Sequence, residues 1–174
     1  MPETRLLRIE EINPLPQAQF IQLLGALFEK SPWVPEQAWQ KRPFASRDAL
    51  LAAMAQVVED AGEEKLITLI QAHPDLGARL EERAALTPES FREQGGTGLF
   101  AIAESELEQL RALNADYAAR FDFPFVICAR LNSISTIFNA IKKRLTHPRE
   151  EEVAEAWTQI QKIAALRLND LVTE

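Results

Sequence analysis

The chain has 174 residues, 47% of them hydrophobic and 26% charged, which is the composition of a globular protein and excludes a disordered or fibrous one. A chain of this length can bury a core of its own, so we expect a single domain over residues 1–174. Its 19 basic against 26 acidic residues give a net charge of −7, which repels phosphate and anionic lipid and excludes nucleic acid and membrane surfaces as partners.

Apolar periodicity predicts three helices in the first half of the chain. A helix over about 16–29 is indicated by apolar residues at the spacing of one buried face, namely Phe20, Leu23, Leu24 and Leu27. Ser46 can cap a second long helix, which Gly62 ends. The third helix contains Leu66 to Ile70 and must end near His73, because Pro74 disfavours helical geometry in the residue before it.

The second half of the chain adds further helices and one apolar run. Thr87 and Pro88 start a short helix that glycines end, and a longer helix covers about 101–120. Residues 123–129 fit either a buried extended segment or the start of a helix, and their short length favours the extended form. Two more helices follow, one up to Leu145 and one from Pro148 to about Leu171. About eight helices without an alternating strand pattern predict an all-α fold.

Motifs for metal and nucleotide chemistry are absent from the sequence. One cysteine and two histidines, His73 and His147, do not make a zinc-type cluster, and there is no phosphate loop, dinucleotide fingerprint or serine nucleophile elbow. We therefore expect no metal and no organic cofactor. The lone Cys128 cannot form an intramolecular disulfide and residues 1–15 hold no signal peptide, so we expect a cytoplasmic protein.

Two groups of polar residues in the middle of the chain could carry chemistry. His73, between a helix end and a proline, can present an imidazole to a cavity, although a histidine that only complements the helix dipole is also typical there. Ser90, Glu93 and Gln94 share one helical face as hydroxyl, carboxylate and amide, and such a trio is equally common on solvated helices.

The last helix contains an arginine among apolar residues. Its inward stripe consists of Trp157, Ile160, Ile163, Ala164, Leu168 and Leu171, and the spacing puts Arg167 in that stripe. A guanidinium that faces the core needs paired acceptors or a ligand to offset its desolvation. The spacing leaves both a structural salt bridge and a ligand site open.

Six motifs spread from Ser31 to Leu168 resemble those of the 2-oxo-4-hydroxy-4-carboxy-5-ureidoimidazoline (OHCU) decarboxylases, a family that acts on a late intermediate between urate and allantoin. The first three are Ser31-Pro32-Trp33-Val34, Arg42-Pro43-Phe44 and Ala72-His73-Pro74-Asp75-Leu76-Gly77. The others are the S-x-x-E-Q run from Ser90 to Gln94, the run from Phe123 to Arg130, and the run from Lys162 to Leu168.

The resemblance implies an all-helical fold and a homodimer. It implies that His73 is the catalytic acid or base, that Glu93 lies beside it, and that Arg167 is catalytic too. The further residues that it implies around the substrate are Pro74, Ser90, Phe91, Arg92, Gln94, Phe125, Val126, Ile127, Cys128 and Ala129. The chain departs from the family pattern at 95–100, where Gly95-Gly96-Thr97-Gly98-Leu99-Phe100 replaces small residues, a leucine and an acid.

The function expected from this resemblance is the decarboxylation of OHCU to (S)-allantoin, a carboxy-lyase step late in urate degradation and purine metabolism. The alternative is a catalytically silent protein that binds ureides or purines and regulates or channels the pathway. A purely structural helical module, in which His73 and Arg167 are packing residues, is a further alternative.

Overall fold

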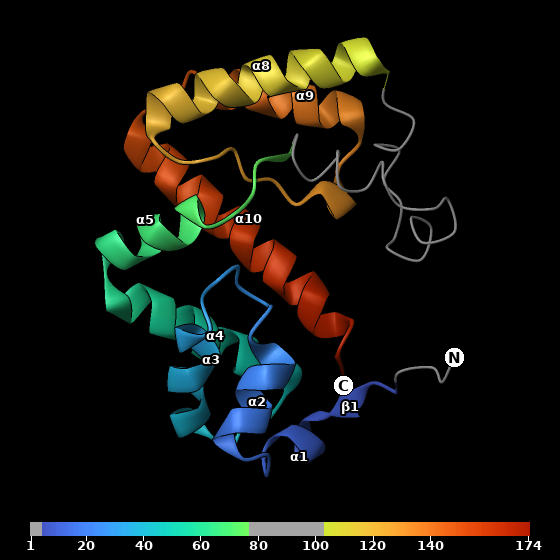
Figure 1. Ribbon diagram of the computed structural model, residues 1–174. Helices are drawn as coiled ribbons and strands as arrows, with labels where there is room; N and C mark the ends of the chain where they lie inside the picture. The colour runs from blue at the N-terminus through green and yellow to red at the C-terminus, as the bar shows by residue number, and fades with distance from the viewer. Residues whose placement is uncertain (1–4, 77–102) are drawn as a thin grey trace. The chain divides into compact units, whose positions relative to one another are not determined.

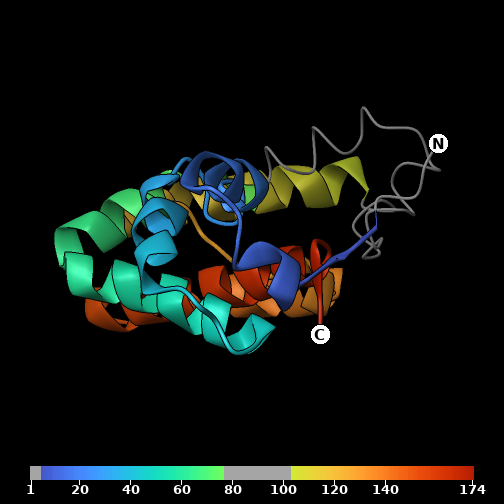
Figure 2. The ribbon, with the colours of Figure 1, turned by 90° about the horizontal axis from the view of Figure 1, so that it is seen from below.

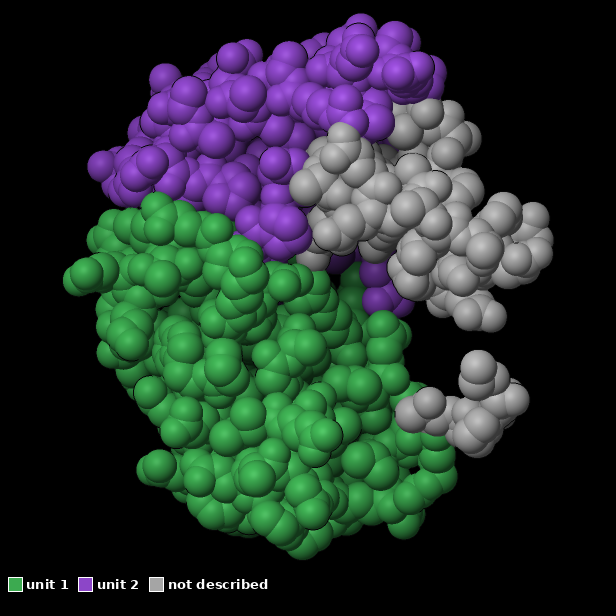
Figure 3. Space-filling model, viewed as in Figure 1, with its two compact units in different colours: residues 1–72, 161–174 green, residues 73–160 purple. Residues whose placement is uncertain are grey.

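The computed structural model describes residues 5–76 and 103–174 of the chain (Figure 1). The chain divides into two compact units, unit 1 with residues 1–72 and 161–174, and unit 2 with residues 73–160 (Figure 3). Eight α-helices occur in the described residues, so the expected all-α fold is confirmed. None of these helices is both long and apolar enough to cross a bilayer. The single domain over 1–174 stays a prediction.

Unit 1 begins and ends with a short strand. β1 (Leu7–Arg8) pairs in parallel with β2 (Val172–Thr173), and the two lie side by side in Figures 1 and 2. The Leu7 N–H also donates to the Leu171 carbonyl at 3.0 Å. Between the strands in sequence lie α1 (Ile9–Ile12), α2 (Gln17–Leu24), α3 (Trp33–Ala38), the 3-10 turn η1 (Trp39–Lys41), α4 (Arg47–Ala61) and α5 (Glu63–Gln71).

The predicted boundaries of α4 and α5 are confirmed. The Ser46 hydroxyl oxygen accepts the Ala49 N–H at 3.0 Å and so satisfies one of the open amides of the first turn of α4. Gly62 ends α4 with a φ of 95°, a backbone conformation that residues with a side chain rarely adopt. α5 ends at Gln71, two residues before His73, as Pro74 requires.

The first predicted helix is shorter than its apolar pattern indicates. α2 stops at Leu24 instead of reaching 29. At Gly25 a Cβ would stand 2.6 Å from the Ile21 carbonyl oxygen, so the close turn there suits glycine. Leu27 and Phe28 are buried all the same, because a turn rather than a helix carries them into the core. Periodicity therefore identified Phe20, Leu24 and Leu27 as buried correctly, whereas Leu23 is only half-buried and the helix was extended by more than a turn.

Unit 2 is built from helices and one irregular segment. Its elements are α8 (Glu104–Phe121), the 3-10 turn η3 (Ala129–Leu131), α9 (Ile134–Arg144) and the first part of α10 (Arg149–Asn169). Asp122 ends α8 in the left-handed conformation with a φ of 64°. Residues 124–128 have no regular secondary structure and Phe125 to Cys128 are buried, so the interpretation of this run as a buried non-helical segment is confirmed.

Four aromatic side chains form the core beside this segment. Tyr117 lies at the centre, with ring centroids 4.6 Å from Phe121, 5.9 Å from Phe123 and 5.3 Å from Phe125. The pairs are tilted or edge-on, as aromatic quadrupoles prefer. The ring contacts of this cluster hold the chain from the end of α8 to Phe125 against Tyr117.

A buried ion pair joins α9 to α10 within unit 2. Arg144 Nε donates to Glu152 Oε1 at 2.7 Å, and both side chains are almost completely buried. The same carboxylate oxygen accepts the Tyr117 hydroxyl at 2.5 Å, and His147 Nδ1 lies 2.9 Å from Glu152 Oε2. Buried charges are costly unless hydrogen bonds satisfy them, and here both carboxylate oxygens have partners.

The titration of Tyr117 tests this buried cluster directly, because it is the only tyrosine in the chain. Burial, and then its hydrogen bond to Glu152, raise the pKa of Tyr117 far above the ordinary 10.0. At about pH 11 the native protein should show little tyrosinate absorbance, whereas a free tyrosine is mostly ionised there.

The raised pKa also sets the direction of the effect on stability. The contribution of Tyr117 to the free energy of unfolding is fully present below about pH 10 and is lost as the pH rises towards the folded-state pKa, because the unfolded chain releases the proton first. The control is the same titration in denaturant. Native and denatured curves that coincide would contradict the buried position of the phenol.

Candidate active site

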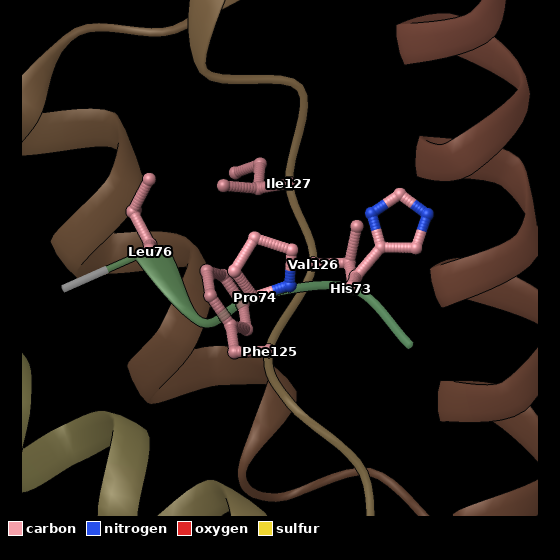
Figure 4. A pocket seen from close by; sticks show the side chains of 6 residues that line it. All are labelled: His73, Pro74, Leu76, Phe125, Val126 and Ile127. Carbon is pink, nitrogen blue, oxygen red and sulfur yellow. The ribbon is translucent and has the colours of Figure 1, made fainter. Parts of the chain in front are cut away.

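A small hollow in unit 2 brings together residues far apart in the sequence. It has a volume of about 200 Å³, open space at its mouth included, and its lining consists of His73, Pro74, Leu76, Phe125, Val126 and Ile127. Figure 4 shows the segment that carries His73 running past the segment that carries Phe125 to Ile127.

His73 supplies the titratable group of the hollow. It follows the last turn of α5 and is buried, with 4% of its surface exposed. Pro74 fixes its own φ near −65° and restricts the backbone of the residue before it, so the position of the imidazole is constrained by the chain itself. Leu76, also buried, belongs to the His-Pro-Asp motif but was not predicted to line a site.

The opposite wall is main chain held by polar side chains. Arg144 Nη1 donates to the Val126 carbonyl at 2.7 Å, and the Cys128 N–H donates to Gln159 Oε1 at 3.0 Å. Asn132 Nδ2 donates to the Cys128 carbonyl at 2.8 Å. Three peptide groups of a segment without helix or strand are thus satisfied by side chains from neighbouring elements.

These contacts set the direction of the main chain of Ile127. In a trans peptide the carbonyl and the N–H point to opposite sides, so the Ile127 N–H points away from Arg144 and the Ile127 carbonyl away from Gln159. Within the described residues neither group of Ile127 makes a hydrogen bond, although its side chain is buried. Ile127, which lines the hollow, therefore has one main-chain donor and one acceptor that no described residue takes up.

The structure brings five of the residues predicted for the site to this hollow: His73, Pro74, Phe125, Val126 and Ile127. Cys128 and Ala129 are buried in the same segment without lining it. The predictions for Ser90, Phe91, Arg92, Glu93 and Gln94 fall on residues outside the described part of the chain, as does the glycine-rich stretch at 95–100.

Arg167 lies in unit 1 and forms an ion pair there. Its Nη2 is 2.6 Å from Glu29 Oε1, and its Nη1 donates to the carbonyls of Ala26 at 3.1 Å and Leu27 at 3.3 Å. The side chain of Arg167 is 27% exposed, so Arg167 stands at the edge of the apolar stripe rather than within the core. Nothing in the spacing of the sequence pointed to Glu29, because a loop residue 138 positions away has no periodic relation to Arg167.

Comparison with known proteins identifies the family. The model of the OHCU decarboxylase family matches residues 13–169 of the chain. A protein of Halalkalicoccus jeotgali, "2-oxo-4-hydroxy-4-carboxy-5-ureidoimidazoline decarboxylase", is 38% identical, and the match covers 95% of this chain and 92% of that protein. A protein of Homo sapiens, "Putative 2-oxo-4-hydroxy-4-carboxy-5-ureidoimidazoline decarboxylase", is 34% identical, and the match covers 94% of this chain and 95% of that protein.

Solved structures have the same fold. The crystal structure of an (S)-allantoin synthase matches with a TM-score of 0.78 and 25% identity, covering 96% of this chain and 54% of that one. An OHCU decarboxylase crystallised in the presence of (S)-allantoin matches with a TM-score of 0.62 and 19% identity, over 88% of this chain and 96% of the other. The fold and the site together define a class of all-helical proteins with a small hollow that contains a histidine. The chain belongs to the OHCU decarboxylase family.

Proposed function

We propose that this protein decarboxylates 2-oxo-4-hydroxy-4-carboxy-5-ureidoimidazoline to (S)-allantoin. The observation that carries the proposal is the position of His73, a buried imidazole at a small hollow, in a chain whose relatives are named for this reaction over almost their whole length. The name of the substrate describes a compact ring with amide-type edges, which suits the main-chain donor and acceptor of Ile127.

The substrate supplies its own electron sink. One ring carbon carries a hydroxyl and the carboxylate, and the neighbouring ring carbon carries the ureido group and a C=N double bond. When the bond to the carboxylate breaks, carbon dioxide leaves and its electron pair forms a C=C bond between the two ring carbons. The electrons of the C=N bond move onto the ring nitrogen and the carbonyl oxygen conjugated with it, and the nitrogen takes up a proton, which gives an enol. A proton then arrives at the ureido-bearing carbon and the enol hydroxyl loses its proton, which gives the ring carbonyl of allantoin. No external redox partner or electron carrier is needed.

The protein must orient the substrate and deliver that proton to one face. We assign proton transfer to His73, with Glu93 fixing the tautomer and raising the basicity of the imidazole. Ile127, through its N–H and carbonyl, reads the ureido or amide edge of the substrate, together with Ser90 and Gln94. Arg167 interacts with a ring oxygen that gains negative charge, because stabilising the departing carboxylate would favour the ground state instead.

We also propose a cytoplasmic homodimer that works without metal or cofactor. The dimer is carried over from the family resemblance, and the absence of metal and cofactor is inferred from the missing sequence motifs and from the electron sink of the substrate. The location is inferred from the lone cysteine, Cys128, which is buried. The molar mass in solution tests the dimer.

Chelation should leave the activity unchanged. The ring itself takes up the electron pair, so exhaustive treatment with EDTA followed by dialysis should preserve the full rate on freshly prepared substrate. The control is the untreated enzyme in the same dialysed buffer. A rate lost on chelation and restored by one divalent ion would overturn the metal-independent mechanism.

Replacing Arg167 by leucine should remove most of the turnover while preserving the fold. Leucine suits the apolar stripe, and a partly exposed ion pair contributes only about 0.2–1 kcal/mol to stability. Loss of a donor that stabilises transition-state charge lowers kcat by roughly 10²–10³-fold. Circular dichroism checks the fold and steady-state kinetics the rate.

Glu29→Gln is the matched control for Arg167→Leu. It removes the charged partner of Arg167 but leaves the arginine and its carbonyl acceptors in place. We expect Glu29→Gln to retain most of the activity. Equal losses in the two variants would mean that Arg167 acts only through the ion pair and is not catalytic.

His73→Asn should leave the helical fold intact and remove proton transfer. Asparagine keeps some hydrogen bonding and tolerates a helix end, whereas a positioned acid or base contributes about 10²–10⁴-fold to the rate. Allantoin formed above the spontaneous background should drift towards a racemic mixture, because no group delivers the proton from one face. The circular dichroism of the product measures this.

The decarboxylation rate of the wild-type protein, measured together with its binding of allantoin, distinguishes the enzyme from a silent ureide-binding protein. Wild-type protein that binds allantoin but does not accelerate decarboxylation would establish the binding alternative. A folded His73→Asn variant that still makes one enantiomer at a near-normal rate would exclude His73 as the proton carrier.

A further inference from the structure

We propose that Gln159 and Arg144 are positioning residues that present the main chain of Ile127 to the substrate. The proposal rests on the proposed function, because it assigns a task to residues that support the same hollow. Neither side chain lines the hollow. Each acts through one peptide group of the wall, Arg144 through the Val126 carbonyl and Gln159 through the Cys128 N–H.

Arg144 holds the peptide plane between Val126 and Ile127 with a charged donor whose own position is fixed. Its guanidinium is fixed by Glu152 at 2.7 Å and lies 4.5 Å above the ring of Phe125. A third interaction, from Nη2 to the Tyr117 hydroxyl, spans 3.4 Å. Because the fork of an arginine is planar, these contacts determine where Nη1 meets the Val126 carbonyl.

Gln159 holds the next peptide plane with a neutral amide. It is buried on α10, and its Nε2 donates to Glu155 Oε1 at 2.8 Å, one helical turn earlier. This bond decides which end of the amide faces the wall, since a carboxylate can only accept. The oxygen of Gln159 is therefore the atom turned towards the Cys128 N–H.

The two bonds fix two successive peptide planes, and Ile127 lies between them. A segment without helix or strand has no ladder to hold its peptide groups, so each plane could otherwise rotate. Fixing both in advance removes the cost of ordering the Ile127 N–H and carbonyl when a ligand binds. A donor and an acceptor with fixed directions can then discriminate an amide or ureido edge from an ester or hydrocarbon edge.

Loss of the hydrogen bond between the Cys128 N–H and Gln159 should weaken substrate binding more than it slows the chemical step. Gln159→Met keeps the volume and removes the acceptor for the Cys128 N–H. We expect KM to rise roughly five- to tenfold, the effect of about one hydrogen bond, with kcat changed less than about threefold. Gln159→Asn, whose shorter side chain cannot reach the Cys128 N–H, should behave in the same way and serves if the methionine variant does not fold.

A swapped pair provides the rescue. Gln159→Glu combined with Glu155→Gln keeps the net charge, lets residue 155 donate to residue 159, and again gives the Cys128 N–H an acceptor. This double variant should return KM to within about twofold of the wild type, since the direct hydrogen bond is restored. Glu155→Gln alone leaves the hydrogen bond between the Cys128 N–H and Gln159 in place. This single variant should also keep KM within about twofold of the wild type.

The possible outcomes separate this inference from the proposed function. Wild-type protein without decarboxylase activity would overturn the proposed function itself. An active wild type whose folded Gln159→Met and Gln159→Asn variants keep the wild-type KM, with only a lower melting temperature, would reduce Gln159 to a packing residue. A raised KM that the swapped pair fails to restore would also overturn the positioning role.

Discussion

The buried ion pair between Arg144 and Glu152 is the interaction on which the organisation of unit 2 depends. Taking both charges out of water is unfavourable, and the pair persists because further groups complete its hydrogen bonds. Tyr117 and His147 satisfy the carboxylate, and the Val126 carbonyl takes up the remaining side of the guanidinium. The ion pair therefore links α8, α9 and α10 to the irregular segment that forms one wall of the hollow.

That link explains how an irregular segment can serve as a binding surface. A helix or strand would use its own N–H and carbonyl groups in its hydrogen-bond pattern, whereas this segment receives its hydrogen bonds from the side chains of Arg144, Gln159 and Asn132. The main-chain groups of Ile127 are thereby left without a partner among the described residues, and we propose that the substrate takes them up. The hollow combines one titratable side chain, His73, with directed but uncharged main-chain groups, which suits a reaction whose substrate carries its own electron sink.

The ion pair of Arg167 is compatible with the catalytic role that we propose for it. Its contacts with Glu29 and two carbonyls hold the guanidinium in one orientation, and 27% of its surface remains exposed. A preorganised cation needs no reorganisation when charge develops on a bound ligand. The environment of Arg167 is thus set by Glu29 as much as by the apolar residues that surround Arg167 on α10.

The sequence by itself determined the helical class, the cap at Ser46, the break at Gly62 and the end of α5 before His73, because these depend on local backbone preferences. Motif order also indicated the family and the Phe125 to Ala129 run. Only the tertiary structure revealed the partners of that run and of Arg167. Arg144, Gln159 and Glu29 meet their partners across 18, 31 and 138 residues, and side-chain contacts over such separations have no periodicity or spacing that a single sequence can display.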